Sequence, residues 1–134
     1  PIADLVTPNI DEAERLAGIP IRTIQEAEEA AQIILNLGCR AVLIKGGHLR
    51  SDPGCDLFYD GKKCVRFKEE WIRSPNTHGT GCVYSAAIAA NMARGIPLET
   101  AIRKAKKYLT QTIRHGLAIG HGKGPVDPFY KLRK

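Results

Sequence analysis

The chain is organised around Thr77-His78-Gly79-Thr80-Gly81-Cys82, which runs directly into the small-residue stretch Val83-Tyr84-Ser85-Ala86-Ala87-Ile88-Ala89-Ala90. Two glycines, one on each side of Thr80, indicate a tight turn. The alanine-rich run that follows favours a helix from about Gly81 to Ala93. The unpaired N–H groups and positive dipole end of that helix would suit a phosphate or a developing negative charge. The simpler alternative is a plain loop-to-helix junction in which Thr80 caps the helix.

Length and composition favour an ordinary globular domain spanning residues 1–134. The chain is 43% hydrophobic and 25% charged, which is typical of such domains. No apolar run reaches the roughly 18–20 residues that a membrane span needs, so we expect no membrane partner. No secretory signal is visible, and we expect a cytoplasmic protein. The first residue is Pro1 rather than Met, which suggests a fragment or a processed chain.

Cysteine spacing and charge narrow the candidate partners. Cys39, Cys55, Cys64 and Cys82 form no C-x-x-C pair, which argues against a zinc ribbon and favours free thiols in a reducing compartment. The formal charge of +6 permits attraction to phosphates. Aromatic residues make up only 6% of the chain and are not interleaved with the basic residues. We therefore expect no nucleic-acid partner.

The N-terminal residues predict a strand followed by a helix. Ala3–Thr7 has the pattern of a short strand, and Pro8 ends it because proline has no N–H for a ladder. Asn9 and Glu12 have the spacing of a capping box, which predicts a helix through about Ala17.

A second helix and a buried strand follow. Thr23 and Glu26 repeat the capping-box spacing. The helix that they open has its apolar residues on one face: Ile24, Ala27, Ala31, Ile34 and Leu35. Ala41-Val42-Leu43-Ile44 is then a continuous apolar run, typical of a strand in a parallel sheet covered on both faces.

A hairpin comes next. The segments Asp56–Tyr59 and Cys64–Phe67 flank Asp60-Gly61, a pair that favours a tight turn between two antiparallel strands.

The C-terminal third predicts one more helix and a glycine-rich loop. Pro97 stands where a first helical residue would. The core stripe is expected to be Leu98, Ala101, Ile102, Ala105, Leu109 and Ile113, and the basic residues Arg103, Lys104, Lys106, Lys107 and Arg114 are expected to face solvent. The loop Gly120-His121-Gly122-Lys123-Gly124-Pro125 follows. These elements predict an α/β layered sheet with helices on both faces, and the few strands suggest a portion of a larger sheet.

Three motifs carry residues suited to phosphate chemistry: Asn9-x-x-Glu12, Lys45-Gly46-Gly47-His48 and Gly79-Thr80-Gly81-Cys82. In an open α/β sheet, motifs that end strands or open helices can meet in one crevice. A carboxylate can hold Mg²⁺, a lysine can neutralise phosphate charge, and a cysteine at a helix start can accept a proton. Each also has a plain structural alternative: a capping box, a solvated lysine or a small apolar cysteine.

Together these residues give the chain its resemblance to the hydroxymethylpyrimidine/phosphomethylpyrimidine kinases, a branch of the ribokinase-like superfamily. The resemblance covers nearly the whole chain, and Asn76-Thr77-His78-Gly79-Thr80-Gly81-Cys82 is its most specific part. The other matching segments are Val6-Thr7-Pro8-Asn9 with Glu12-Ala13, Gly38-Cys39, Ala41 to Leu49, Leu57-Phe58-Tyr59-Asp60-Gly61, Ser85 to Ala90 and Gly124-Pro125-Val126.

This resemblance implies ATP- and Mg²⁺-dependent phosphorylation of 4-amino-5-hydroxymethyl-2-methylpyrimidine and then of its monophosphate, in thiamine biosynthesis. It makes Cys82 the catalytic base and the amides of Gly79, Thr80, Gly81 and Cys82 the anion hole. It also implies that Asn9, Lys45 and Lys123 contact ATP or its phosphates and that Glu12 serves the metal ion.

The family is about twice as long as this chain, so the resemblance implies a C-terminal, ATP-binding half of a kinase domain. We expect it to be inactive alone and to pair with the N-terminal half of the same kinase or with a second copy. Pro75, Val83-Tyr84 and Asp127-Pro128 depart from the usual family residues. A pyridoxal-type kinase fragment and a non-catalytic nucleotide- or phosphate-binding module remain the alternatives.

Overall fold

The computed structural model describes residues 2–47, 49 and 51–133. The chain forms two compact units, Pro1–Lys68 and Glu69–Lys134, and each is described by itself. No helix in the described part of the chain is long and apolar enough to cross a membrane.

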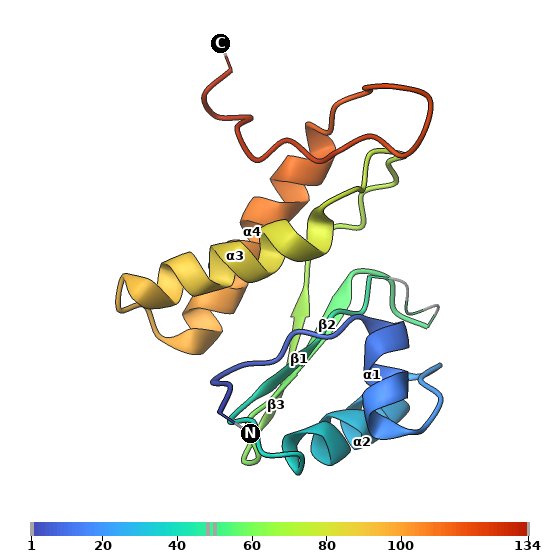
Figure 1. Ribbon diagram of the computed structural model, residues 1–134, viewed down its shortest axis with the longest axis vertical. Coiled ribbons are helices and arrows are strands. Elements are labelled where there is room, and N and C mark those ends of the chain that lie inside the picture. The colour runs from blue at the N-terminus through green and yellow to red at the C-terminus, as the bar shows by residue number, and fades with distance from the viewer. Residues whose placement is uncertain (1, 48, 50, 134) are drawn as a thin grey trace. The chain divides into compact units, whose positions relative to one another are not determined.

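The first unit is built on a three-stranded antiparallel sheet in the order β1-β2-β3 (Figure 1). Its strands are β1 (Val42–Ile44), β2 (Cys55–Tyr59) and β3 (Cys64–Lys68). The predicted hairpin is confirmed: β2 pairs with β3 from Cys55↔Lys68 to Tyr59↔Cys64, and Gly61 takes the left-handed conformation in the turn, with φ of 86°.

The expectation of a parallel sheet is wrong for these strands, because β1 pairs antiparallel with β2. All three residues of β1 are nevertheless buried, as the apolar run predicted. The N-terminal segment lies on the other side of β1 and runs parallel to it, through isolated bridges Val6↔Val42 and Asn9↔Lys45. The predicted strand at residues 3–7 is thus reduced to single bridges, and Pro8 contributes only its carbonyl, which accepts from the Lys45 N–H at 2.8 Å.

Helices α1 (Ile10–Ala17) and α2 (Ile24–Leu35) begin where the capping boxes predicted. Both boxes are complete, and Gly18 ends α1 with φ of 72°. Helix α2 packs against β1 and β2, and α1 packs against α2. The core between them is formed by Ala13, Ala27, Ala30, Ala31, Ile34, Val42, Ile44 and Leu57, among others.

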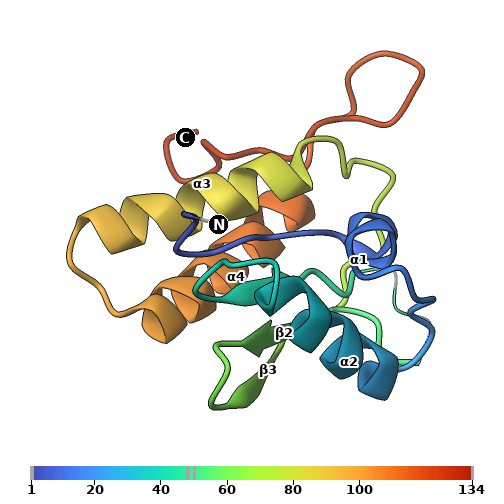
Figure 2. The same ribbon diagram turned by 60° about the horizontal axis from the view of Figure 1, so that its bottom comes forward.

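The second unit holds α3 (Thr80–Ala93) and α4 (Leu98–Arg114), which pack side by side (Figures 1 and 2). The first helix was predicted within one residue at both ends, and the start of the second within one residue, since Pro97 is the N-cap of α4 rather than its first residue.

Lys106 was wrongly expected to face solvent, since it is only 6% exposed. It lies one turn beyond Ile102 on the buried face, so its aliphatic stem packs with the core. Its Nζ lies 5.8 Å from the centroid of the Tyr84 ring of α3, a cation–π contact.

Candidate phosphate-binding and catalytic site

The turn before α3 has the geometry of an open helix N-terminus. Gly79 is the N-cap, with φ of 86° and ψ of 0°, and no side chain of the described residues caps the helix. Thr80 is already the first helical residue, so the expectation that it caps α3 is wrong. The first bond of the helical ladder runs from the Val83 N–H to the Gly79 carbonyl at 2.9 Å.

The Thr80 N–H makes a long bond to the Thr77 carbonyl, at 3.4 Å, so the amides of Gly79, Gly81 and Cys82 are the groups that this turn presents to a ligand. An α-helix leaves its first N–H groups without helical partners, and their partial positive charge favours an anion. Helices α1 and α2 satisfy such groups with capping boxes, whereas no side chain of the described residues caps α3 or α4. Cys82 lies in the first turn of α3, and its side chain is exposed. A thiol and several backbone donors thus share one helix start.

The C-terminal glycine-rich segment lies directly against this turn. His78 and Pro125 form a parallel bridge, in which the His78 N–H donates to the Gly124 carbonyl and the Val126 N–H donates to the His78 carbonyl, both at 3.1 Å. A Cβ built on Gly79 would lie 3.9 Å from the Val126 side chain. Lys123 is exposed and immediately precedes this bridge. The segment that carries Lys123 is therefore anchored beside the turn that carries Cys82.

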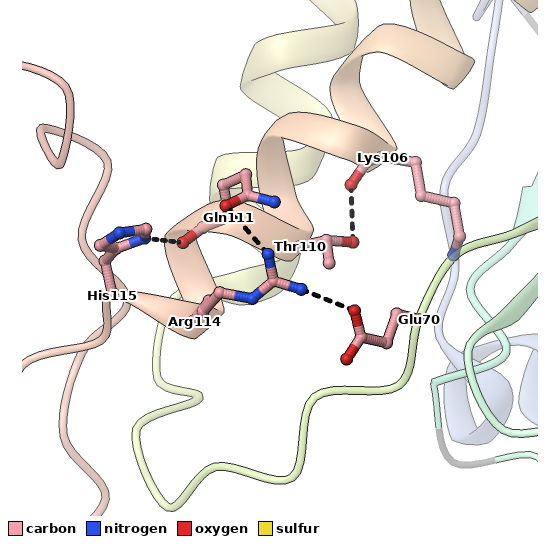
Figure 3. Close-up of polar contacts among 6 residues, drawn as sticks. All are labelled: Glu70, Lys106, Thr110, Gln111, Arg114 and His115. Atoms are coloured by element: carbon pink, nitrogen blue, oxygen red, sulfur yellow. Dashed lines mark hydrogen bonds and ion pairs between the residues drawn. The ribbon is translucent and has the colours of Figure 1, made fainter.

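The irregular segment that leads into the turn is tied to the end of α4. Figure 3 shows Arg114 reaching Glu70, and the Arg114 Nη2 lies 2.6 Å from the Glu70 Oε2. The same guanidinium donates to Gln111, and the His115 ring lies 2.9 Å from the Gln111 carbonyl (Figure 3). The Arg114–Glu70 pair is largely exposed, so it fixes position more than it adds stability.

The tail after the glycine-rich segment is held by Asp127. Asp127 is 2% exposed, and its carboxylate lies 3.0 Å from the Arg133 Nε and accepts from the Phe129 N–H. Tyr108 of α4 donates to the Pro128 carbonyl at 2.6 Å. Burial, with the nearby Tyr130 and Asp127, raises the pKa of Tyr108, so this donor stays protonated.

In the first unit the structure brings together Asn9, Glu12 and Lys45. Asn9 forms the parallel bridge with Lys45, at the end of β1. The Asn9 Oδ1 accepts from the Glu12 N–H, and the Glu12 Oε2 accepts from the Asn9 N–H, each at 2.8 Å. Asn9 and Glu12 are exposed and Lys45 is half-buried. The capping box is therefore real, and it also presents an amide and a carboxylate beside a lysine.

These residues fit a magnesium ion that takes most of its ligands from water and phosphate. Among the described residues no group of three His, Cys, Asp or Glu side chains could hold a metal. Glu12 supplies one carboxylate, of which Oε2 serves the cap. Mg²⁺ in phosphate-transfer sites commonly takes one or two carboxylates and completes its shell with water and phosphate. The donor set fits that arrangement. Glu12 also borders a shallow hollow of about 450 Å³, lined by Val6, Thr7, Pro8, Glu12, Arg15 and Leu16.

The glycine that follows Lys45 is required by close packing. A Cβ on Gly46 would overlap the Cys55 carbonyl, and the Gly46 N–H donates to the buried Asp56 carboxylate at 3.0 Å. This contact holds the chain after β1 against the start of β2. His48, the last residue of the predicted motif, lies outside the described residues.

Comparison with known proteins places this geometry in a family. Residues 1–127 match the family model described as phosphomethylpyrimidine kinase. The chain belongs to the phosphomethylpyrimidine kinase family. It is 47% identical over 133 residues to a hydroxymethylpyrimidine/phosphomethylpyrimidine kinase of Synechococcus elongatus, and the match covers 98% of this chain and 51% of that protein. It is 49% identical over 127 residues to the thiamine biosynthesis bifunctional protein ThiED of Geobacter sulfurreducens, over 95% of this chain and 26% of that protein.

The fold agrees with this membership. A pyridoxal kinase from Staphylococcus aureus in complex with AMP-PCP superposes with a TM-score of 0.92 at 34% identity, over 98% of this chain and 49% of that one. The predicted ribokinase-like α/β class is thereby confirmed. The chain spans about half the length of the kinases of the family that it matches, or less.

Sequence reasoning missed the packing behind the turn. Asn76 was noted only as part of the motif, and Gly116 was not noted at all. Both lie where α4 ends and the glycine-rich segment returns, and a Cβ on Gly116 would come within 2.7 Å of the Asn76 Cβ. No periodicity marks such a contact, because its partners are 40 residues apart.

Proposed function

We propose that this chain is the ATP- and phosphate-binding portion of a kinase that phosphorylates 4-amino-5-hydroxymethyl-2-methylpyrimidine and its monophosphate in thiamine biosynthesis. The observation that carries the proposal is the uncapped start of α3 with the exposed Cys82 in its first turn. Family membership over residues 1–127 supplies the chemical context.

In the proposed reaction, Cys82 as thiolate accepts the proton of the substrate hydroxyl. The hydroxyl oxygen forms a bond to the γ-phosphorus of ATP, the bond from that phosphorus to the β–γ bridging oxygen breaks, and ADP leaves. The amides of Gly79, Thr80, Gly81 and Cys82 hold the transferring phosphoryl oxygens, where negative charge is concentrated. The chain's contribution is positioning, proton acceptance and charge stabilisation.

The remaining proposed contacts are to the nucleotide. Lys45 and Lys123 neutralise phosphate charge, and the side-chain Nδ2 of Asn9 donates a hydrogen bond to a phosphate oxygen. Glu12 contributes to holding Mg²⁺, which when bound neutralises part of the phosphate charge. The four free cysteines among the described residues fit a reducing cytoplasm, where we place this activity.

A complete site requires a partner. The matched relatives are about twice as long or longer, and phosphoryl transfer needs both reactants positioned. We therefore propose that the chain alone does not turn over and that the N-terminal half of such a kinase, or a second copy, supplies the remaining wall.

The test is a chimera of this chain with the N-terminal half of the Synechococcus elongatus relative. We expect ATP-dependent phosphorylation of the pyrimidine alcohol by the chimera and none by the 134-residue chain. Cys82→Ala should lower kcat by about 10²-fold or more, the usual worth of a general base. Cys64→Ala is the matched control, because Cys64 is also exposed but lies on β3. An active Cys82→Ala chimera, or turnover by the chain alone, would contradict the proposal.

A pyridoxal-type kinase is the second candidate, because the fold match to the Staphylococcus aureus pyridoxal kinase is close, at a TM-score of 0.92. Joining this chain to the N-terminal half of that enzyme makes the parallel chimera. If only the pyridoxal chimera is active, and only on pyridoxal, the second candidate replaces the first.

A further inference from the structure

Asn76 occupies the space left by two glycines that are distant from it in sequence. A Cβ on Gly116 would lie 2.7 Å from the Asn76 Cβ and 3.1 Å from its carbonyl oxygen. A Cβ on Gly124 would overlap the Asn76 Oδ1 and the Leu117 carbonyl. The Asn76 side chain is thus packed at its root against the end of α4 and at its tip against the glycine-rich segment.

The three segments that meet at Asn76 are joined by backbone hydrogen bonds. The Leu117 N–H donates to the Pro125 carbonyl at 2.9 Å, and the His78 N–H donates to the Gly124 carbonyl at 3.1 Å. The Asp127 N–H donates to the Thr112 carbonyl of α4 at 3.0 Å. Residues 124–127 therefore connect α4 to the turn before α3.

The path from this contact to the turn is short. In the parallel bridge Pro125 faces His78, and the next residue, Val126, lies nearest to Gly79. Anything that moves residues 124–126 away from Asn76 moves the surface on which Gly79 rests. Interiors are close-packed, so an added methyl group here must displace backbone. The Arg114–Glu70 pair holds the preceding segment to the same end of α4 (Figure 3).

We propose that Asn76, packed between Gly116 and Gly124, is a positioning residue that sets the placement of the Gly79–Cys82 amides for phosphate. This inference rests on the proposed function, since it takes those amides to be the anion site. Asn76 itself does not touch the phosphate. It acts by fixing the distance between the end of α4 and residues 124–126.

The first experiment measures position without any ligand, on the 134-residue chain. Backbone amide resonances of Thr80, Gly81 and Cys82 are compared between wild type and Gly116→Ala, Gly124→Ala and Asn76→Ala. We expect them to shift in all three variants. Gly122→Ala is the matched control, because a Cβ on Gly122 meets nothing within 4 Å, and it should leave these resonances in place.

The second experiment titrates the same chains with inorganic phosphate. We expect saturable shifts at residues 79–82 in wild type and in Gly122→Ala, and binding about 10-fold weaker in Gly116→Ala, because small misplacements of binding groups are costly. A double-mutant cycle then isolates the contact. In an Asn76→Gly background, which removes the Cβ that Gly116→Ala strikes, adding Gly116→Ala should weaken binding less than 3-fold further (about 0.65 kcal/mol).

The outcomes separate the two proposals. If wild type shows no phosphate shifts at residues 79–82, the anion site fails, whatever the ligand-free spectra show. If wild type binds, the positioning role is overturned by unmoved amides in the variants or by fully additive losses in the cycle. Urea unfolding establishes which variants are folded. Among folded variants, a general loss of stability would not make the effects of Asn76→Gly and Gly116→Ala on phosphate binding non-additive. Should Gly116→Ala or Gly124→Ala fail to fold, Asn76→Ala, which adds no atoms, decides by its resonances and its phosphate affinity.

Discussion

The two capping boxes of the first unit allow the effect of Asn9 on stability to be separated from its proposed contact with the nucleotide. Asn9→Ala removes an acceptor that lies 2.8 Å from the Glu12 N–H. The return bond, from the Asn9 N–H to the Glu12 carboxylate, uses the backbone and survives. Replacing an N-cap asparagine by alanine costs about 1 kcal/mol. Helix α1 has only eight residues, so it has few other bonds to compensate.

Thr23→Ala is the matched control, since Thr23 caps α2 with the same box but has no proposed nucleotide contact. Its bond to the Glu26 N–H is longer, at 3.3 Å, so we expect a loss in the lower part of the range, about 0.5–1 kcal/mol. Both losses are measured by urea unfolding of the 134-residue chain, followed by circular dichroism.

Asn9→Asp separates the two roles. Aspartate caps a helix about as well as asparagine, so the free energy of unfolding should change by only a few tenths of a kcal/mol. Its negative charge would repel a nucleotide phosphate, so the KM for ATP of the chimeric kinase should rise several-fold. Thr23→Ala should leave this KM unchanged. An Asn9→Asp chimera with the wild-type KM would refute the phosphate contact and leave Asn9 a helix cap alone.

Three further predictions concern the first unit. Gly46→Ala should destabilise the chain by more than about 2 kcal/mol in urea unfolding, because its methyl group meets the Cys55 carbonyl, whereas Gly122→Ala should change it by less than about 1 kcal/mol. Phe58→Ala should cost about 3–5 kcal/mol, because this ring is 2% exposed and packs edge-on against Phe67, while Leu37→Ala, 55% exposed, should cost under about 1 kcal/mol by the same measurement. Burial, then the Glu28 charge, raises the pKa of Cys64, so Glu28→Gln should lower that pKa and shift iodoacetamide alkylation of Cys64, followed by mass spectrometry, to lower pH; an unshifted profile contradicts this cause.

Local sequence rules predicted most elements of this fold, because their determinants lie within a few residues of each other. The Asn9–Glu12 and Thr23–Glu26 spacings located two helix starts, and Asp60-Gly61 located the hairpin. The direction of strand pairing, by contrast, depends on residues that are distant in the sequence. The apolar run at Ala41–Ile44 indicated burial, which is correct, but the same pattern fits a strand with a parallel neighbour on one side and an antiparallel one on the other.

The fate of Lys106 shows a second limit of sequence patterns. Lys106 was predicted to face solvent because it is one of several basic residues in this helix. It is buried because it lies one turn from Ile102, on the apolar face. The cost of burying an ammonium is reduced where an aromatic face lies nearby, as the Tyr84 ring does. The position of Lys106 on the apolar face of α4 therefore determined its burial more than its charge did.

The candidate site depends on a departure from the rule that located the first two helices. Helices α1 and α2 have side-chain caps, which satisfy an orphan N–H within the chain. Helix α3 begins at a left-handed glycine with no side-chain cap, and its residues 80 to 82 are small or polar. Serine, threonine, asparagine or aspartate is favoured at an N-cap with extended backbone, as at Asn9 and Thr23, whereas Gly79 is left-handed. Helix α4 also begins without a side-chain cap from the described residues, at Pro97, so the left-handed Gly79 and the exposed Cys82, rather than the missing cap alone, distinguish the start of α3. Serine or aspartate at position 79 would be strained at φ of 86° and would fill the anion site with a side-chain oxygen. Gly79→Asp should therefore abolish phosphate shifts at residues 80–82, whereas a mere loop-to-helix junction would lose stability at most.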